Sequence, residues 1–271
     1  MSHAAALVTA AIGGALAVIA FLAFVSLVFA AFVKPPRNGL RANRQRPPAL
    51  TRRVVVCAGD SLTHASLSGD YLALLQERFP ETVFVNAGQN GATSLDLVKR
   101  VDDIAACSPN AITLLIGCND VLRSNTDAVA KTLSEHIQKV IVELRVKSTA
   151  AIAIASLAPL GELPGDTLNG RLDVCNAAIR ELAEMNGVAY LPISEALWRE
   201  IAQQRRDAAA PFRFRVSMLF RSAVQRFWRR KSFDEIAAEN GYVVMSDGVH
   251  LSERGSRIVA GVIGGWLAGV A

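Results

Sequence analysis

The first 33 residues carry a different hydrophobic pattern from the rest of the chain. Residues 4–33 form an uninterrupted run without a charged side chain. Because about 20 apolar residues span the hydrocarbon core of a bilayer, the run predicts an N-terminal transmembrane anchor over residues 1–33. A cleaved signal peptide is the alternative. It has a positive start and an apolar region of about 7–15 residues, and this run is twice too long.

From residue 54 onward, short apolar runs alternate with amphipathic stretches. The apolar runs are Val54–Cys57, Val83–Asn86, Ala111–Ile116, Ala150–Ala155 and Val188–Leu191. The amphipathic stretches between them are Tyr71–Phe79, Leu95–Ala106, Asp127–Lys147 and Leu168–Asn186. Short continuous apolar runs are typical of parallel strands buried on both faces. The alternation predicts an α/β fold, a three-layer α/β/α sandwich around a mostly parallel five-stranded sheet.

Charge divides the remaining chain further. The net charge is +5, yet residues 34–53 hold seven basic and no acidic residues, and residues 199–231 hold ten basic and two acidic. The first segment also contains four prolines and is predicted to be a linker between the anchor and a domain over 54–271. Two local basic segments suit a membrane surface better than a nucleic acid, which requires a basic face on the folded unit itself.

The basic residues after the anchor also predict its orientation. By the positive-inside rule, they place the C-terminal domain in the cytoplasm of a single-pass membrane protein. The four widely spaced cysteines agree with a reducing compartment. Export of the domain is the alternative.

The ends of the predicted strands carry the candidate chemistry, since sites in such sheets gather at the carboxyl edge. Ser61 follows the first strand, and a hydroxyl becomes a nucleophile when a base removes its proton. His250 is the candidate base, because imidazole titrates near neutral pH. Asp247, three residues earlier, is expected to orient the imidazole and stabilise its charged form.

Acyl transfer also requires donors for the developing oxyanion. The expected donors are the N–H of Gly88, the side-chain amide of Asn119 and the N–H of Ser61. Asn86 and Asp120 are expected to fix the loops beside them. No cofactor motif or metal-ligand spacing is present, so the chemistry is expected to need neither a metal nor a cofactor.

Four sequence blocks resemble those of the SGNH (GDSL) hydrolases, a family of serine esterases and lipases. The blocks are Gly59-Asp60-Ser61-Leu62, Asn86-x-Gly88-x-x-Gly91, Gly117-x-Asn119-Asp120 and Asp247-x-x-His250. The resemblance implies a flavodoxin-like sandwich and gives Ser61, Gly88, Asn119 and His250 the four named roles, with Asp247 completing the triad. It covers residues 54–198 and 241–271, and it leaves out the anchor and most of residues 199–240.

The insertion at 199–240 interleaves aromatic and basic residues, and a helix is predicted over Val216–Arg230. Residues 212–231 have the profile of an interfacial helix on anionic lipid. The alternative is a solvated helix that packs its aromatic residues on the domain, because the apolar positions form no single clean stripe.

The expected function is hydrolysis of carboxylic esters by a membrane-anchored serine hydrolase, with lipid or long-chain acyl esters favoured. An acyltransferase and a short-chain or sugar O-acetyl esterase would use the same triad. A catalytically silent membrane adaptor is a hypothesis of another class.

Overall fold

The computed structural model describes residues 3–44, 52–124, 126, 128–204 and 211–270. Its centre is a five-stranded sheet in the order β2-β1-β3-β4-β5, with every neighbouring pair parallel. The strands are β1 Val54–Gly59, β2 Val83–Gly88, β3 Ala111–Leu115, β4 Ala151–Ala155 and β5 Ala189–Leu191. The predicted fold class is therefore confirmed, and the five strands lie where the apolar runs placed them.

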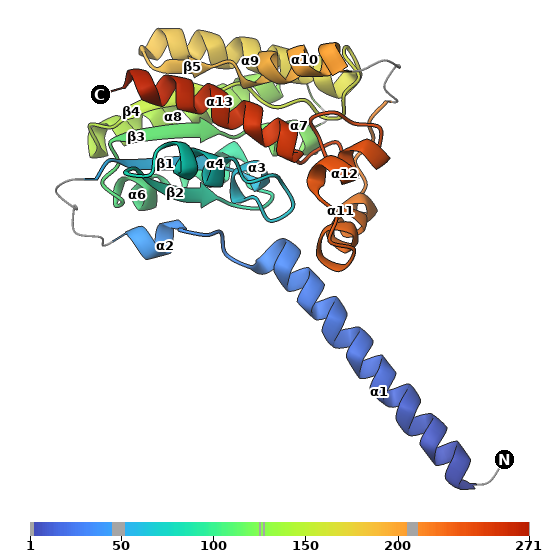
Figure 1. Cartoon of the computed structure of the whole chain (residues 1–271). Helices are drawn as coiled ribbons and strands as arrows, with labels where there is room; N and C mark the ends of the chain where they lie inside the picture. Colours follow the sequence, from blue (N-terminus) through green and yellow to red (C-terminus); the bar gives the residue numbers. More distant parts are fainter. Residues whose placement is uncertain (1–2, 45–51, 125, 127, 205–210, 271) are drawn as a thin grey trace.

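Helices cover both faces of the sheet (Figure 1). One hydrophobic core joins the sheet to α5 Ser94–Val98, α6 Val101–Ala105, α8 Val129–Lys147 and α9 Thr167–Asn186. The other joins it to α4 Tyr71–Arg78, α10 Ile193–Gln204 and α13 Glu253–Gly269. Strands buried from both sides explain why their sequences are continuous apolar runs.

The stretch 95–106, predicted as one helix, forms two. A capping box of Thr93 and Asp96 begins α5, and the chain bends at Arg100 before α6. The Arg100 guanidinium donates to the Ala87 carbonyl at 3.0 Å and lies 3.4 Å from the Gly59 carbonyl. The bend occurs where Arg100 contacts the ends of β1 and β2. A helical pattern in the sequence does not reveal such a long-range contact.

The N-terminal segment forms a long helix, α1 His3–Val28, which continues as the π-helical turn η1 Phe29–Val33. Within the described residues, Ile12–Val33 is the one helical stretch long and apolar enough to cross a membrane, a test that a signal sequence also passes. Figure 1 shows α1 projecting away from the α/β unit.

The linker begins with structure of its own. Asn38 accepts from the Asn86 N–H at 3.0 Å and donates to the Phe84 carbonyl, so the chain before α2 Leu40–Asn43 lies against β2. Its first part is therefore docked on the sheet edge, whereas the prolines of the predicted linker favoured an extended chain. Pro47 and Pro48, on which that expectation partly rested, lie outside the described residues.

The insertion forms α11 Val216–Ala223, the π-helical turn η2 Val224–Trp228 and α12 Phe233–Glu239. Its residues 205–210 lie outside the described chain. The Phe220 ring stacks on Phe24 at 6.4 Å between centroids and meets Phe32 at 5.4 Å. Together with a small buried cluster that includes Leu27 and Ala223, these rings fasten α11 to the end of the N-terminal helix.

Candidate active site

Ser61 lies at the tight turn that follows β1. It is the first residue of α3 Ser61–His64, and the Asp60 carboxylate caps this helix by accepting from the Leu62 N–H at 3.0 Å. A side chain at Gly59 would meet the Thr63 hydroxyl at 2.2 Å and the Leu115 carbonyl at 2.5 Å. Only glycine fits there, and the turn leaves Ser61 partly exposed beside buried neighbours.

The structure brings Ser61, His250 and Asp247 together in one hydrogen-bonded relay. His250 Nε2 lies 3.1 Å from Ser61 Oγ, and His250 Nδ1 lies 2.9 Å from Asp247 Oδ2. The other Asp247 oxygen accepts from the backbone N–H groups of Val249 and His250. An ionised carboxylate only accepts hydrogen bonds, so Nδ1 donates and the neutral ring presents Nε2 as an acceptor to the Ser61 hydroxyl.

Burial and charge have opposite effects on the pKa values of Asp247 and His250. Burial alone would raise the pKa of Asp247, but the charge and hydrogen bonds of His250 hold that pKa below its ordinary value. Burial would likewise lower the pKa of His250, but the Asp247 carboxylate outweighs it, so the pKa of His250 is raised. The arrangement stabilises an imidazolium next to Ser61, which is what a base needs when it removes the serine proton.

Asp60 is a second buried carboxylate close to His250. Burial raises its pKa to about 6, although the Leu62 N–H and the charge of His250 act in the opposite direction. Asp247 and Asp60 are the two carboxylates whose charges act on His250.

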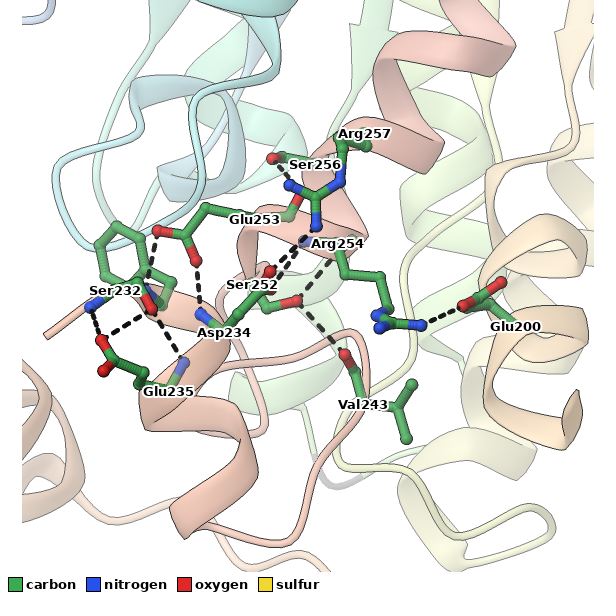
Figure 2. A network of polar contacts seen from close by, with 12 residues as sticks. Glu200, Ser232, Asp234, Glu235, Val243, Ser252, Glu253, Arg254, Ser256 and Arg257 are labelled. Carbon is green, nitrogen blue, oxygen red and sulfur yellow. Dashed lines mark hydrogen bonds and ion pairs between the residues drawn. The ribbon is translucent and has the colours of Figure 1, made fainter. Parts of the chain in front are cut away.

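The loop that carries Asp247 and His250 is fastened at both ends. Its last residues pair with the loop after α3: Leu251 N–H donates to Ser68 Oγ and Gly69 N–H to the Leu251 carbonyl. At its base, the Ser252 hydroxyl donates to the Val243 carbonyl (Figure 2).

A polar network then joins α12 to the first turn of α13, directly after this loop (Figure 2). Glu253 accepts from the backbone N–H groups of Phe233 and Asp234, and Asp234 accepts from the Arg254 N–H. Arg254 in turn pairs with Glu200 of α10. The end of the insertion is thereby tied to the helix that follows His250.

Two of the three expected oxyanion donors lie at or near Ser61. Asn119, at the start of α7 Cys118–Arg123, donates to the Ala92 carbonyl at 2.9 Å, and its amide lies 3.4 Å from Asp60 Oδ2. The Ser61 N–H has no hydrogen-bond partner within the described residues. Both groups lie at the carboxyl edge of the sheet, beside the nucleophile.

The third expected donor, Gly88, does not present its N–H to the site, because that N–H donates to Asn86 Oδ1 at 2.9 Å. Gly88 is small for a different reason: a side chain would lie 2.2 Å from the His64 nitrogen, where α3 crosses β2. Three residues on, Gly91 has φ +71° and an N–H without a partner in the described chain. The block Asn86-x-Gly88-x-x-Gly91 contains both glycines. Its sequence does not show which of the two backbone N–H groups already has a hydrogen-bond partner.

Asn86 and Asp120 make hydrogen bonds that join neighbouring loops. Asn86 also donates to the Thr63 carbonyl at 2.8 Å, which ties β2 to α3. Asp120 accepts from the backbone and hydroxyl of Ser94, and that hydroxyl lies 2.8 Å from His136 Nδ1. The loops after β2 and β3 are thus joined through one carboxylate.

Cys118 adjoins Asn119 but does not compete with Ser61 as a nucleophile. Burial raises the pKa of its thiol well above the ordinary value, so the thiol stays protonated. Among the residues that the structure describes, no group of three or more His, Cys, Asp and Glu side chains is arranged to hold a metal ion.

Comparisons with known proteins agree with the fold and with the family that the four sequence blocks resemble. The sequence model of the GDSL-like Lipase/Acylhydrolase family matches residues 57–258. No curated protein matches the sequence significantly. Among solved structures, the acetyl xylan esterase AlAXEase has a TM-score of 0.61 and 21% identity, covering 79% of this chain and 98% of its own. The lipase/acylhydrolase from Enterococcus faecalis has a TM-score of 0.56 and 17% identity, with 80% and 96% covered. At these identities the likeness shows a shared fold.

The charge of Asp247 predicts the pH dependence of the reaction. With the pKa of His250 raised, the ascending limb of kcat/KM is expected above the ordinary histidine value of about 6.5. Asp247→Asn removes the negative charge that raises the pKa of His250, while burial, which lowers this pKa, and the charge of Asp60 remain. The limb should then move to lower pH, and kcat should fall about 10⁴-fold. Rate profiles from pH 4 to 10 measure both effects, and Asp173→Asn on α9 is the control. An unmoved limb in Asp247→Asn would show that this carboxylate does not act on the base.

Proposed function

The chain belongs to the GDSL-like lipase/acylhydrolase family and is a serine ester hydrolase of the SGNH type, and we propose that Ser61, Asp247 and His250 are its catalytic triad. The observation that carries this assignment is the continuous relay from Asp247 through His250 to Ser61, with 2.9 Å and 3.1 Å between its polar atoms. Both distances lie within the reach required for a nucleophile and its base.

In the proposed reaction, Ser61 Oγ attacks the ester carbonyl carbon while His250 Nε2 takes the hydroxyl proton. The N–H groups of Ser61 and Gly91 and the side-chain amide of Asn119 stabilise the oxyanion, with Gly91 taking the place that the sequence analysis gave to Gly88. The C–O bond to the alcohol breaks, and the alcohol leaves with the proton from His250. Water then attacks the acyl-serine by the same steps, which releases the carboxylic acid and restores Ser61.

We favour a lipid or long-chain acyl ester as the substrate, because the site belongs to a chain with an apolar N-terminal helix. A short acetyl ester is the second candidate. It is supported by the acetyl xylan esterases among the structures of the same fold, AlAXEase and Axe2 from Geobacillus stearothermophilus. An acyltransferase would differ only in having an alcohol attack the acyl-serine instead of water.

A panel of p-nitrophenyl esters with two to sixteen carbons tests the assignment and the substrate class together. The full-length protein in detergent should prefer long chains. Ser61→Ala should lower kcat by about 10⁴-fold or more, because the nucleophile is lost. Ser66→Ala, in the adjoining loop, is the matched control and should retain activity. A maximum at two carbons would favour acetyl esters. Unchanged turnover in Ser61→Ala would contradict the triad, and product esters formed only with an added alcohol would indicate a transferase.

We also propose that α1 anchors the protein in a membrane and that residues 212–231 lie at the lipid surface. From Ile12 onward most α1 side chains are apolar yet exposed, with Leu16 61% and Phe21 64% accessible, and such a surface requires an apolar cover. The helix α11 packs on the end of α1 through Phe220. Val216 and Trp228 remain 59% and 54% exposed. The same segment carries exposed arginines, as an interfacial segment on anionic lipid does: Arg213, Arg215, Arg221, Arg229 and Arg230.

Trp228 provides a direct test of this placement. In a full-length variant with Trp198→Phe and Trp266→Phe, Trp228 is the single tryptophan. This variant is reconstituted in anionic vesicles that contain lipids brominated near the headgroup. Bromine should strongly quench the fluorescence of Trp228, because its ring is expected to lie at the interface. The matched control keeps only Trp266, on α13, and should stay bright. Equal quenching of the two would contradict the interfacial placement.

The basic residues that follow α1, among them Lys34 and Arg37, support a cytoplasmic hydrolase domain. Protease added to spheroplasts is expected to leave residues 54–271 intact and to digest them only after the membrane is permeabilised. Digestion in intact spheroplasts would show that the domain is exported.

A further inference from the structure

Glu162 is a fully buried carboxylate outside the proposed triad. It lies in the loop after β4, and it accepts hydrogen bonds from three consecutive backbone N–H groups. These belong to Val243 at 2.9 Å, Val244 at 2.8 Å and Met245 at 3.0 Å. Oε1 receives all three, and Oε2 receives a second contact from the Val243 N–H at 2.9 Å. Hydrogen bonds to a charged acceptor are roughly twice as strong as neutral ones, so this is a firm attachment.

The three N–H groups open the loop that carries the catalytic pair. Met245 is two residues before Asp247, and Met245 pairs with Leu251 on the returning arm in an antiparallel bridge. The carbonyls on the same stretch are also occupied. Val243 accepts from the Ser252 hydroxyl, as Figure 2 shows, and Val244 accepts from the Ser252 N–H. Glu162 therefore binds the backbone N–H groups of the incoming arm, while Ser252 binds its carbonyls.

The neighbour of Glu162 holds the tip of the same loop. The Gly161 N–H donates to the Gly248 carbonyl at 2.7 Å, between Asp247 and His250. Phe212 fills the space beside this contact, since a side chain at Gly161 or Gly248 would lie 2.4 Å or 2.5 Å from its atoms. Residues 161–162 thus attach the loop after β4 to both the base and the tip of the Asp247–His250 loop.

We propose that Glu162 is a positioning residue that sets the placement of Asp247 and His250 relative to Ser61. The proposal rests on the triad assigned above. Ser61 begins α3 directly after β1, whereas the segment from Val243 to Leu251 belongs to no named strand or helix, so its position comes from contacts such as these. A carboxylate suits the task because it offers only acceptors to a row of donors.

The test compares full-length wild type, Glu162→Gln and Leu144→Ala in detergent with a p-nitrophenyl ester. In Glu162→Gln, an amide oxygen at the Oε1 position leaves an NH₂ group facing the Val243 N–H. We expect kcat to fall about 10- to 100-fold through misplacement of the pair, with KM nearly unchanged. The ascending limb of the pH profile should move to lower pH, because the charge of Asp60 also raises the pKa of His250 and Asp60 does not move with the displaced loop.

Leu144→Ala is the control for destabilisation alone. Leu144 is fully buried near the end of α8, just before β4 begins, and so lies at the edge of the sheet away from the site. It should lower Tm while keeping the wild-type pH limb and KM. A Glu162→Gln variant that behaves like Leu144→Ala would overturn the proposal.

Glu162→Asp, which keeps the charge on a shorter side chain, receives the same measurements if the glutamine variant does not fold. Loss of folding in both variants would give Glu162 a purely structural role and would also overturn the proposal. Ser61→Ala, measured beside them, separates the two hypotheses: if it retains turnover, the triad itself is wrong, whatever Glu162 does.

Discussion

The hydrogen bond between Ser61 and His250 joins segments that are 189 residues apart, and much of the surrounding structure serves to hold its two ends. The parallel register of β1 with β2 and β3 places Ser61 at the carboxyl edge of the sheet. The histidine has no strand beneath it. Its loop is held instead by Ser68, Gly69, Gly161 and Glu162, whose partners are mostly backbone groups. The Asp247–His250 loop has no strand hydrogen bonds to fix its position. Its position therefore depends on buried polar contacts with neighbouring segments.

The two buried aspartates near His250 have pKa values shifted in opposite directions, because their hydrogen-bond partners differ. Both lose solvation, which favours the neutral acid. Asp247 gains two backbone N–H bonds and a direct bond from the imidazole, and its pKa falls. Asp60 has the Leu62 N–H and a more distant charge, and its pKa rises to about 6. The carboxylate beside the imidazole, whose pKa is lowered, is thus the one with the most donors, while Asp60 caps the helix that begins with Ser61.

The sequence was sufficient for the sheet and for the four blocks, because buried strands and glycine turns leave local signals. It was insufficient where function depends on which partner a group has already taken. Gly88 and Gly91 stand in one block, yet only the structure shows the Gly88 N–H bound to Asn86. Glu162 contacts residues more than 80 positions away, and no local pattern marks such a contact. The stacking of Phe220 on Phe24 is of the same kind: aromatic residues in a basic insertion did not reveal that they pack on the N-terminal helix.

The insertion also contacts three separate parts of the molecule: the N-terminal helix, the Asp247–His250 loop and the start of α13. Its Phe220 contacts the N-terminal helix, its Phe212 packs beside Gly248 of the catalytic loop, and α12 is joined to the start of α13 (Figure 2). Each of these three contacts is a packed or hydrogen-bonded junction between short elements. The insertion therefore holds the exposed apolar helix and the Asp247–His250 loop in one packed arrangement, because the same segment contacts both.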